Sequence, residues 1–332
     1  MQTTRKLTRA LLALAAFIAL NSAAFAADPG DPFPASSEIS DLKTGSVSIG
    51  SFYTSSATDP SEENTAMSII NTDANNPAIV HVFFIEGSTC SVADSFVCLT
   101  ANQTASFLAS DVDPGVTGYT VSVTTDSFGV PVANNKMKWI GCIKTKDGHQ
   151  GWIYCWETSA LFPGLLPGVL PTDSTATLVF DGIAGYNRIP RVLATPSIPS
   201  LADDNRTILI INRIGGNLAT SAAPLGPIFG ILYDDQENAA SFTFTSAACQ
   251  FRSNLSNSFP RTTPRFGTFV QSGHTGWMKF FSLSDIGIIG TVLNHNPNTR
   301  TSPTAFNGVG NLIPLTLATS VTLTIPIFPP NC

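Results

Sequence analysis

The sequence predicts an all-β protein built from two tandem β-sandwich domains. Short runs rich in Val, Ile, Phe and Thr recur along the chain and are bounded by Gly, Pro, Asn or Asp, as strands usually are. No stretch beyond residue 26 keeps an apolar period of 3.6 residues for more than about ten residues, so long helices are not expected. Weak internal repetition then suggests that one sandwich is followed by a similar one.

The predicted strands are spread over nearly the whole chain. Each alternates apolar with polar residues or carries a compact β-branched run, which is typical of half-buried or buried strands. In chain order they are Ser46–Thr54, Ala66–Asn71, Ala78–Ile85, Tyr119–Thr124, Thr177–Phe180, Thr207–Asn212, Ile228–Tyr233, Ser241–Thr245, Trp277–Ser282 and Leu315–Ile327.

Two short motifs recur in the second half of the chain. Ser68–Asn71 is echoed by Leu209–Asn212, and the Thr-Gly-Tyr of Thr117–Tyr119 is echoed by a Thr-Gly-Trp ending at Trp277. A repeat on this scale predicts two sandwiches of similar topology, with an insertion in the second.

The boundary between the two domains is expected in a segment rich in proline and glycine. Residues 161–171 read LFPGLLPGVLP, and proline this dense cannot continue a central strand. The predicted organisation is a signal peptide over 1–26, domain 1 over 27–160, a linker over 161–171 and domain 2 over 172–332.

The N-terminus has the pattern of a secretory leader. Arg5, Lys6 and Arg9 precede the apolar run Leu11–Leu20, and Ala24–Ala26 supplies a small-residue cleavage site. The run is about half of what a membrane span needs. We therefore expect cleavage after Ala26 and a secreted, extracellular or cell-surface protein, with the periplasm as the alternative.

The charge balance bears on possible partners. Three of the 17 basic residues lie in the leader and none of the 23 acidic residues does, which leaves the mature chain with 14 basic residues and a net charge of −9. This argues against nucleic acid and anionic membrane surfaces as partners, because both attract basic patches. Beyond the leader no apolar run is long enough for membrane insertion.

Six cysteines in an exported chain indicate disulfides rather than metal ligands. Cys142 and Cys155 lie symmetrically about Gly148-His149, so a hairpin centred there would place them opposite each other. Cys90 and Cys98 flank a short loop and form a second candidate pair. Cys249 and Cys332 would then pair by elimination, although six cysteines allow 15 patterns in all.

Two segments resemble known proteins. In Phe107–Gly129, the residues Pro114, Gly115, Tyr119, Val121 and Val123 resemble the end of a fibronectin type III or related immunoglobulin-like domain. This resemblance implies that both sandwiches are immunoglobulin-like and that the tyrosine forms a corner. The GSTCSVAD segment at residues 87–94 is similar to one in uncharacterised exported bacterial proteins, which brings no known activity.

Catalytic and metal-binding signatures are absent from the sequence. It has no GxSxG nucleophile elbow, SxxK motif or HExxH spacing. Adjacent carboxylates on a strand face opposite ways, so the acidic pairs are not expected to act together. No catalytic residue, metal ligand or cofactor is therefore predicted, and the ligand-binding residues are unknown. The histidines are His81, His149, His274 and His295, and the acidic pairs are Glu62-Glu63, Asp203-Asp204 and Asp234-Asp235.

One turn leaves two interpretations open. Asp111 and Asp113 could hold calcium with their carboxylates, because calcium prefers oxygen ligands. They could equally shape the turn through hydrogen bonds to the backbone, which is the more common role.

These observations favour a non-enzymatic exported or cell-surface protein that acts in adhesion, extracellular matrix or surface assembly. Its partners would be other surface proteins, further copies of itself, or polysaccharide. One alternative is carbohydrate binding by exposed aromatic side chains such as Trp152, Trp156 and Trp277. A second is a secreted glycoside hydrolase, which needs two carboxylates across a cleft. Leu315–Ile327 is expected to be the last strand of domain 2, or else to complete a neighbouring copy by strand addition.

Overall fold

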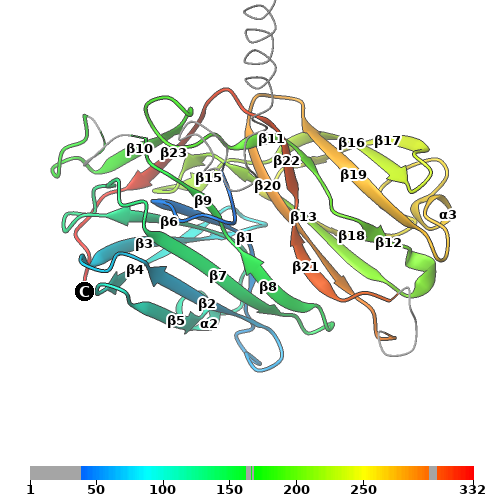
Figure 1. Cartoon of the computed structure of the whole chain (residues 1–332), viewed down its shortest axis with the longest axis horizontal. Coiled ribbons are helices and arrows are strands. Elements are labelled where there is room, and N and C mark those ends of the chain that lie inside the picture. The colour runs from blue at the N-terminus through cyan, green and yellow to red at the C-terminus, as the bar shows by residue number, and fades with distance from the viewer. Residues whose placement is uncertain (1–38, 162–165, 167, 299–304) are drawn as a thin grey trace, which may run out of the picture. The chain divides into compact units, whose positions relative to one another are not determined.

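The computed structural model describes residues 39–161, 166, 168–298 and 305–332, and it is nearly all β (Figure 1). The expected leader with its cleavage site, and residues 162–165 and 167 of the expected linker, lie outside these residues. Within the described chain, no helix is long and apolar enough to cross a membrane.

The first half forms two facing antiparallel sheets. Their strand orders are β4-β3-β6-β1-β9 and β5-β2-β7-β8. The apolar side chains between them, such as Val82, Phe84 and Trp139, form a common core. The strands are β1 (Val47–Thr54), β2 (Asn64–Asn71), β3 (Ala78–Glu86), β4 (Val92–Leu99), β5 (Thr104–Leu108), β6 (Thr117–Thr125), β7 (Met137–Lys144), β8 (Gln150–Tyr154) and β9 (Trp156–Thr158), with the short helix α2 (Ala109–Val112) before β6.

The second half repeats this arrangement. Its sheets have the orders β17-β16-β19-β11-β22, with β12 also pairing with β19, and β18-β13-β20-β21. The strands are β11 (Pro190–Ala194), β12 (Ile198–Pro199), β13 (Arg206–Ile214), β16 (Gly226–Asp234), β17 (Ala239–Ser246), β18 (Gln250–Asn254), β19 (Thr275–Ser282), β20 (Gly287–His295), β21 (Gly308–Asn311) and β22 (Ile313–Leu317), with helix α3 (Phe266–Phe269) before β19 and the turn η1 (Leu201–Asp203) after β12.

The two halves therefore share one strand order, and β6 and β19 occupy the same place in it. A Cβ atom on Gly118 would collide with the carbonyl oxygen of Ile85, and one on Gly276 would meet the carbonyl oxygen of Tyr233. The two glycines are thus equivalent, as the Thr-Gly-aromatic echo predicts. The matching motifs of β2 and β13 do not occupy equivalent positions. Ile69 points into its sandwich core, whereas Ile210, the residue that matches it in sequence, points out of its own sandwich.

A third, smaller sheet covers the first sandwich. It has the order β10-β23-β14-β15, and its apolar residues share a core with the outer face of the β3-β6-β1 sheet. Its strands are β10 (Thr175–Phe180), β14 (Gly216–Asn217), β15 (Ser221–Ala222) and β23 (Val321–Pro326). The expected strand Leu315–Ile327 is split between β22, which pairs with β11, and β23, which pairs with β10.

Contacts between the halves are extensive, although each sheet draws its strands from one half. Ile143 and Ile153 of the first half pack with Ile208 and Ile210 of the second. Residues 35–332 consequently form one compact unit. Independent folding of residues 27–160 and 172–332 stays a prediction, which expression of the two fragments would test.

The cysteines pair differently from the expected pattern. Cys90 bonds to Cys249, with Cα atoms 5.6 Å apart, and Cys98 bonds to Cys332, with Cα atoms 6.1 Å apart. The expected pairs Cys90–Cys98 and Cys249–Cys332 are therefore wrong. Both disulfides join one half of the chain to the other, which no local spacing could indicate.

Cys142 and Cys155 carry free thiols. The β7–β8 hairpin exists, but Lys144 opposes Gln150, so Cys142 faces Trp152 rather than Cys155. The turn at 145–149 is centred on Asp147, which precedes the predicted centre at Gly148-His149. Cys155 consequently lies on the buried side of the hairpin and Cys142 on the other side, because side chains alternate along a strand.

Candidate functional site

The outer face of the β16-β19 pair carries six half-buried side chains, and no sheet formed by the described residues covers it. They alternate with buried core residues such as Leu232 and Phe280, which point into the sandwich. We call this set the aromatic face. Its residues are Phe229, Ile231 and Tyr233 on β16, and Trp277, Lys279 and Phe281 on β19.

The aromatic face has an exact counterpart in the first half. Tyr233 opposes Trp277 across the ladder as Ile85 opposes Tyr119, and the next two pairs along each ladder also correspond. The counterparts are at most 1% exposed, because the β10-β23 sheet and the chain around it cover them. They are His81, Phe83, Ile85, Tyr119, Val121 and Val123.

The geometry of the aromatic face is set by cross-strand pairing. The Tyr233 and Trp277 rings are stacked, with centroids 4.2 Å apart and planes 11° apart, and Nζ of Lys279 lies 5.1 Å from the Trp277 centroid. Phe229 and Phe281 form a second pair with centroids 5.9 Å apart. Lys279 is the one ionic group among the six residues. The result is a largely apolar surface on a rigid sheet.

Polar groups border this face. The neighbouring edge strand β17 exposes Ala239, Ser241, Thr243 and Thr245. At the end of β16, His274 Nδ1 lies 2.7 Å from a carboxylate oxygen of Asp235. An apolar centre with a polar rim is the usual composition of a protein interface.

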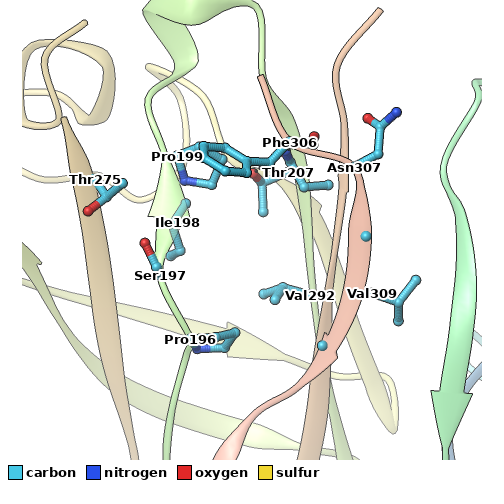
Figure 2. Close-up of a pocket in the computed structure, with 13 residues that line it drawn as sticks. Pro196, Ser197, Ile198, Pro199, Thr207, Thr275, Val292, Phe306, Asn307 and Val309 are labelled. Atoms are coloured by element: carbon cyan, nitrogen blue, oxygen red, sulfur yellow. Dashed lines mark hydrogen bonds between the residues drawn. The ribbon is translucent and has the colours of Figure 1, made fainter. Parts of the chain in front are cut away.

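A pocket of about 330 Å³ opens elsewhere in the second sandwich, between its two sheets (Figure 2). One wall is the segment from Pro196 to Pro199, which includes β12, and the other is β21. Val292 lines it from β20, and Phe306 and Pro199 line it as well (Figure 2).

The tryptophans named for carbohydrate binding are widely separated in the fold. Trp156 is buried, Trp277 lies on the aromatic face, and Trp152 is 62% exposed on β8, which belongs to another sheet. They do not form a joint platform. Tyr154, two residues beyond Trp152 on the same face of β8, is 48% exposed and was not anticipated from the sequence.

The acidic pairs are engaged in turns and loops. One carboxylate oxygen of Asp234 accepts hydrogen bonds from the backbone N–H groups of Gln236 and Asn238. The other accepts from the side-chain amide of Asn238 at 2.7 Å, and this hydrogen bond lowers the pKa of Asp234. Asp203 accepts from Ser272 and from Gly273 N–H. Glu63 accepts from the Thr54 hydroxyl at 2.6 Å. The lining of the pocket between β12 and β21 contains no carboxylate.

Asp111 and Asp113 lie at helix α2 and are used within the fold. Leu108 N–H donates to Asp111 at 3.0 Å, and the Tyr53 hydroxyl donates to Asp113 at 2.5 Å. Burial raises the pKa of Asp113, although the Tyr53 bond opposes it. The Asp111 contact is a side-chain to backbone hydrogen bond and agrees with the turn-shaping interpretation, whereas Asp113 contacts the side chain of a distant strand. In the part of the chain that the structure describes, no group of three His, Cys, Asp or Glu side chains is arranged to hold a metal ion.

Tyr119 does not form the corner that the fibronectin-like resemblance implies. Its hydroxyl donates to the carbonyl oxygen of Arg213 at 3.0 Å, across to the other half of the chain. Burial raises the pKa of this phenol above its usual range. The tyrosine thus links the halves rather than bracing its own strand.

Three of the four histidines lie at packing contacts. His81 is stacked on Phe96 and lies 2.9 Å from Asp94, and burial lowers its pKa. His149 Nε2 contacts the Arg206 carbonyl oxygen at 2.7 Å, which again joins the halves. His295 lies 5.8 Å from His149, and its pKa is lowered mainly by desolvation.

Sequence reasoning also missed a buried carboxylate, Glu157 on β9. It accepts hydrogen bonds from Trp139 N–H at 2.9 Å and from the Ser48 hydroxyl, and Lys138 Nζ lies 3.5 Å away. Burial raises its pKa to about 7. Alternation within the short run Trp156–Thr158 carries no signal for this, because all three residues are buried.

No family model and no curated protein matches this chain.

Proposed function

We propose that this is a non-enzymatic exported or cell-surface protein that acts in adhesion, extracellular matrix or surface assembly. The observation that carries the proposal is the aromatic face. Among the described residues, a sheet covers this face in the first half of the chain and none covers it in the second. In this proposal a protein partner supplies the missing cover.

The equivalent face of the first sandwich, which β10 and β23 cover, indicates the chemistry that such a partner would have. Leu178, Phe180, Leu323 and Ile325 of β10 and β23 present alternate apolar side chains to the first sandwich. A partner with a similar apolar sheet face would bury the aromatic residues in the same way. Aromatic side chains are enriched among the residues that dominate binding energy, which supports this role for Trp277 and Tyr233.

The finer description of the fold is also part of the proposal. We infer that the leader is removed after Ala26 and that the two halves are tandem immunoglobulin-like sandwiches. The pairing of β2 with β5 and of β3 with β6 supports this, because immunoglobulin domains pair strands B with E and C with F. The first and seventh strands differ from that pattern, since β1 pairs with β6 and β7 pairs with β2. The two disulfides that join the halves of the chain, which we call the crossing disulfides, support an oxidising destination such as the cell surface.

The test measures binding of fluorescently labelled mature protein to cells of its source, before and after protease treatment of the cells. The variants are Phe229→Thr and Trp277→Thr, which keep β-forming residues on the sheet. Trp152→Thr is the matched control, because it removes an exposed aromatic residue from another sheet. Thermal unfolding of each variant verifies that the fold is intact.

We expect protease treatment to abolish binding, and the two variants on the aromatic face to weaken it about tenfold, which corresponds to about 1.4 kcal/mol. Trp152→Thr should bind as the unchanged protein does. Binding that survives both the protease and the aromatic-face variants would refute the proposal.

A second candidate function, carbohydrate binding, is favoured by one observation. Trp152 and Tyr154 are exposed on the same face of β8, about 7 Å apart along the strand. Aromatic rings on a strand can stack on sugar rings. This candidate predicts the opposite outcome of the same experiment: protease-resistant binding that Trp152→Thr abolishes.

A further inference from the structure

The pocket between β12 and β21 exists because small residues leave space at two places. Ile198 and Tyr53 occupy equivalent positions, since Ile198 opposes Gly276 on β19 as Tyr53 opposes Gly118 on β6. The fully buried Tyr53 ring fills its sandwich, whereas the smaller Ile198 lines an open pocket in the other.

The second source of space is glycine on β21. Gly308 and Gly310 line the pocket, while Val309 between them points to the far side of the strand, toward Gly151 (Figure 2). A Cβ atom on Gly308 would meet nothing within 4 Å, and neither glycine has the positive φ that only glycine adopts readily. The φ angles therefore do not require glycine at either position, and a Cβ atom on Gly310 would meet only Pro196 Cγ, at 3.4 Å.

Apolar and uncharged polar residues both line the pocket. All thirteen lining residues are uncharged. The Thr207 hydroxyl donates to the Asn294 side-chain oxygen at 2.8 Å, and the Asn294 amide donates to Asn205 at 3.0 Å and to the Phe306 carbonyl oxygen at 2.6 Å. Because Thr207 and Asn294 are already paired, an occupant gains little by offering them hydrogen bonds, and the Ser197 and Thr275 hydroxyls are left for it.

The size limits the occupant further. A volume of about 330 Å³ is near the lower end for ligand sites, and an apolar cavity of about 150 Å³ already accepts benzene. We propose that this pocket binds a small, neutral, mainly apolar molecule of one or two rings, held by contact with Ile198, Pro199, Val292 and Phe306. The site is separate from the aromatic face, so the proposal is independent of adhesion.

The experiment titrates the mature protein with N-phenyl-1-naphthylamine, a neutral two-ring probe whose fluorescence rises in apolar surroundings. Gly308→Leu fills the pocket from a position where a side chain has room. Ala219→Leu adds the same bulk at an exposed turn and serves as the matched control. Gly308→Ala is a milder second variant, and thermal unfolding verifies that each protein is folded.

We expect saturable probe binding to the unchanged protein and to Ala219→Leu. Gly308→Leu should weaken it by about tenfold or more, and Gly308→Ala by less. A charged analogue, 8-anilinonaphthalene-1-sulfonate, should bind less tightly, because the lining offers no cation. Absence of saturable binding to the unchanged protein, or equal binding by a folded Gly308→Leu variant, would overturn the proposal.

Discussion

Glu157 shows how burial sets the properties of a single residue in this protein. The carboxyl group is fully buried, and its contacts with Trp139 N–H, Ser48 and Lys138 offset the desolvation of the charged form only in part. Its pKa is therefore about 7, above the ordinary 4.5. The folded protein thus holds a proton on this group in a pH range where the unfolded chain has released it.

This difference predicts how stability depends on pH. Between pH 4.5 and about 7 the folded state binds more protons than the unfolded state. Glu157 therefore lowers the unfolding free energy as the pH rises through this range, and it does not lower the unfolding free energy below pH 4.5. We compare the unfolding free energy of Glu157→Gln with that of the unchanged protein at pH 4.5 and at about pH 8. The difference should grow by up to about 3 kcal/mol in favour of the variant from the lower to the higher pH. Urea unfolding at both pH values measures it.

The control for this measurement is Glu62→Gln, at an exposed position. It removes one exposed carboxylate and so controls for the change in charge. If the unfolding free energies of Glu157→Gln and the unchanged protein changed equally between pH 4.5 and about pH 8, the Glu157 carboxyl group would not have the raised pKa.

The β7–β8 hairpin shows what an element can and cannot reveal from its sequence. Asp147-Gly148 correctly predicts a turn between two strands, but the prediction centred it on Gly148-His149. The ladder pairs Lys144 with Gln150, so the true centre lies at Asp147. A shift of this kind changes which residues face each other, and register depends on turn geometry that composition does not reveal.

The hairpin register predicts distinct reactivity for its two thiols. Burial raises the pKa of both, and much more strongly for Cys155, which is fully buried, than for Cys142. We expect iodoacetamide at alkaline pH to label Cys142 in the native protein and Cys155 only after unfolding, because the thiolate is the reactive form. Peptide mass spectrometry without reduction measures both sites. A Cys142–Cys155 bond in the map would contradict the register.

Other elements differ in how clearly they could be predicted. The alternating runs that became β1 and β3 were found nearly to the residue. Strand β20 was missed because it contains Gly287 and Gly290, which weaken a strand pattern. A Cβ atom on Gly290 would collide with the Ile210 carbonyl oxygen of the neighbouring strand, so close packing requires glycine there.

At the scale of the whole molecule, the all-β class and the internal repeat could be read from the sequence. The aromatic face could be predicted only in part, as alternation on β16 and β19. Its exposure depends on β10 and β23, which lie far apart in the sequence and pair over the other sandwich instead. Such long-range pairing leaves no local pattern, and the same holds for the disulfides and for Tyr119 bonding to Arg213.

The crossing disulfides predict how strongly the two halves depend on each other. Cys90–Cys249 spans 159 residues and Cys98–Cys332 spans 234, so each restricts the unfolded chain over a long loop. In the chain-entropy model, losing one such link costs about 5 kcal/mol. We expect Cys90→Ser with Cys249→Ser, and separately Cys98→Ser with Cys332→Ser, to lower the unfolding free energy by up to this amount. Cys142→Ser, which removes a half-exposed thiol but no link, should change it by less than about 1 kcal/mol. Denaturant unfolding without reductant compares the three, and equal stabilities would show that the disulfides do not hold the halves together.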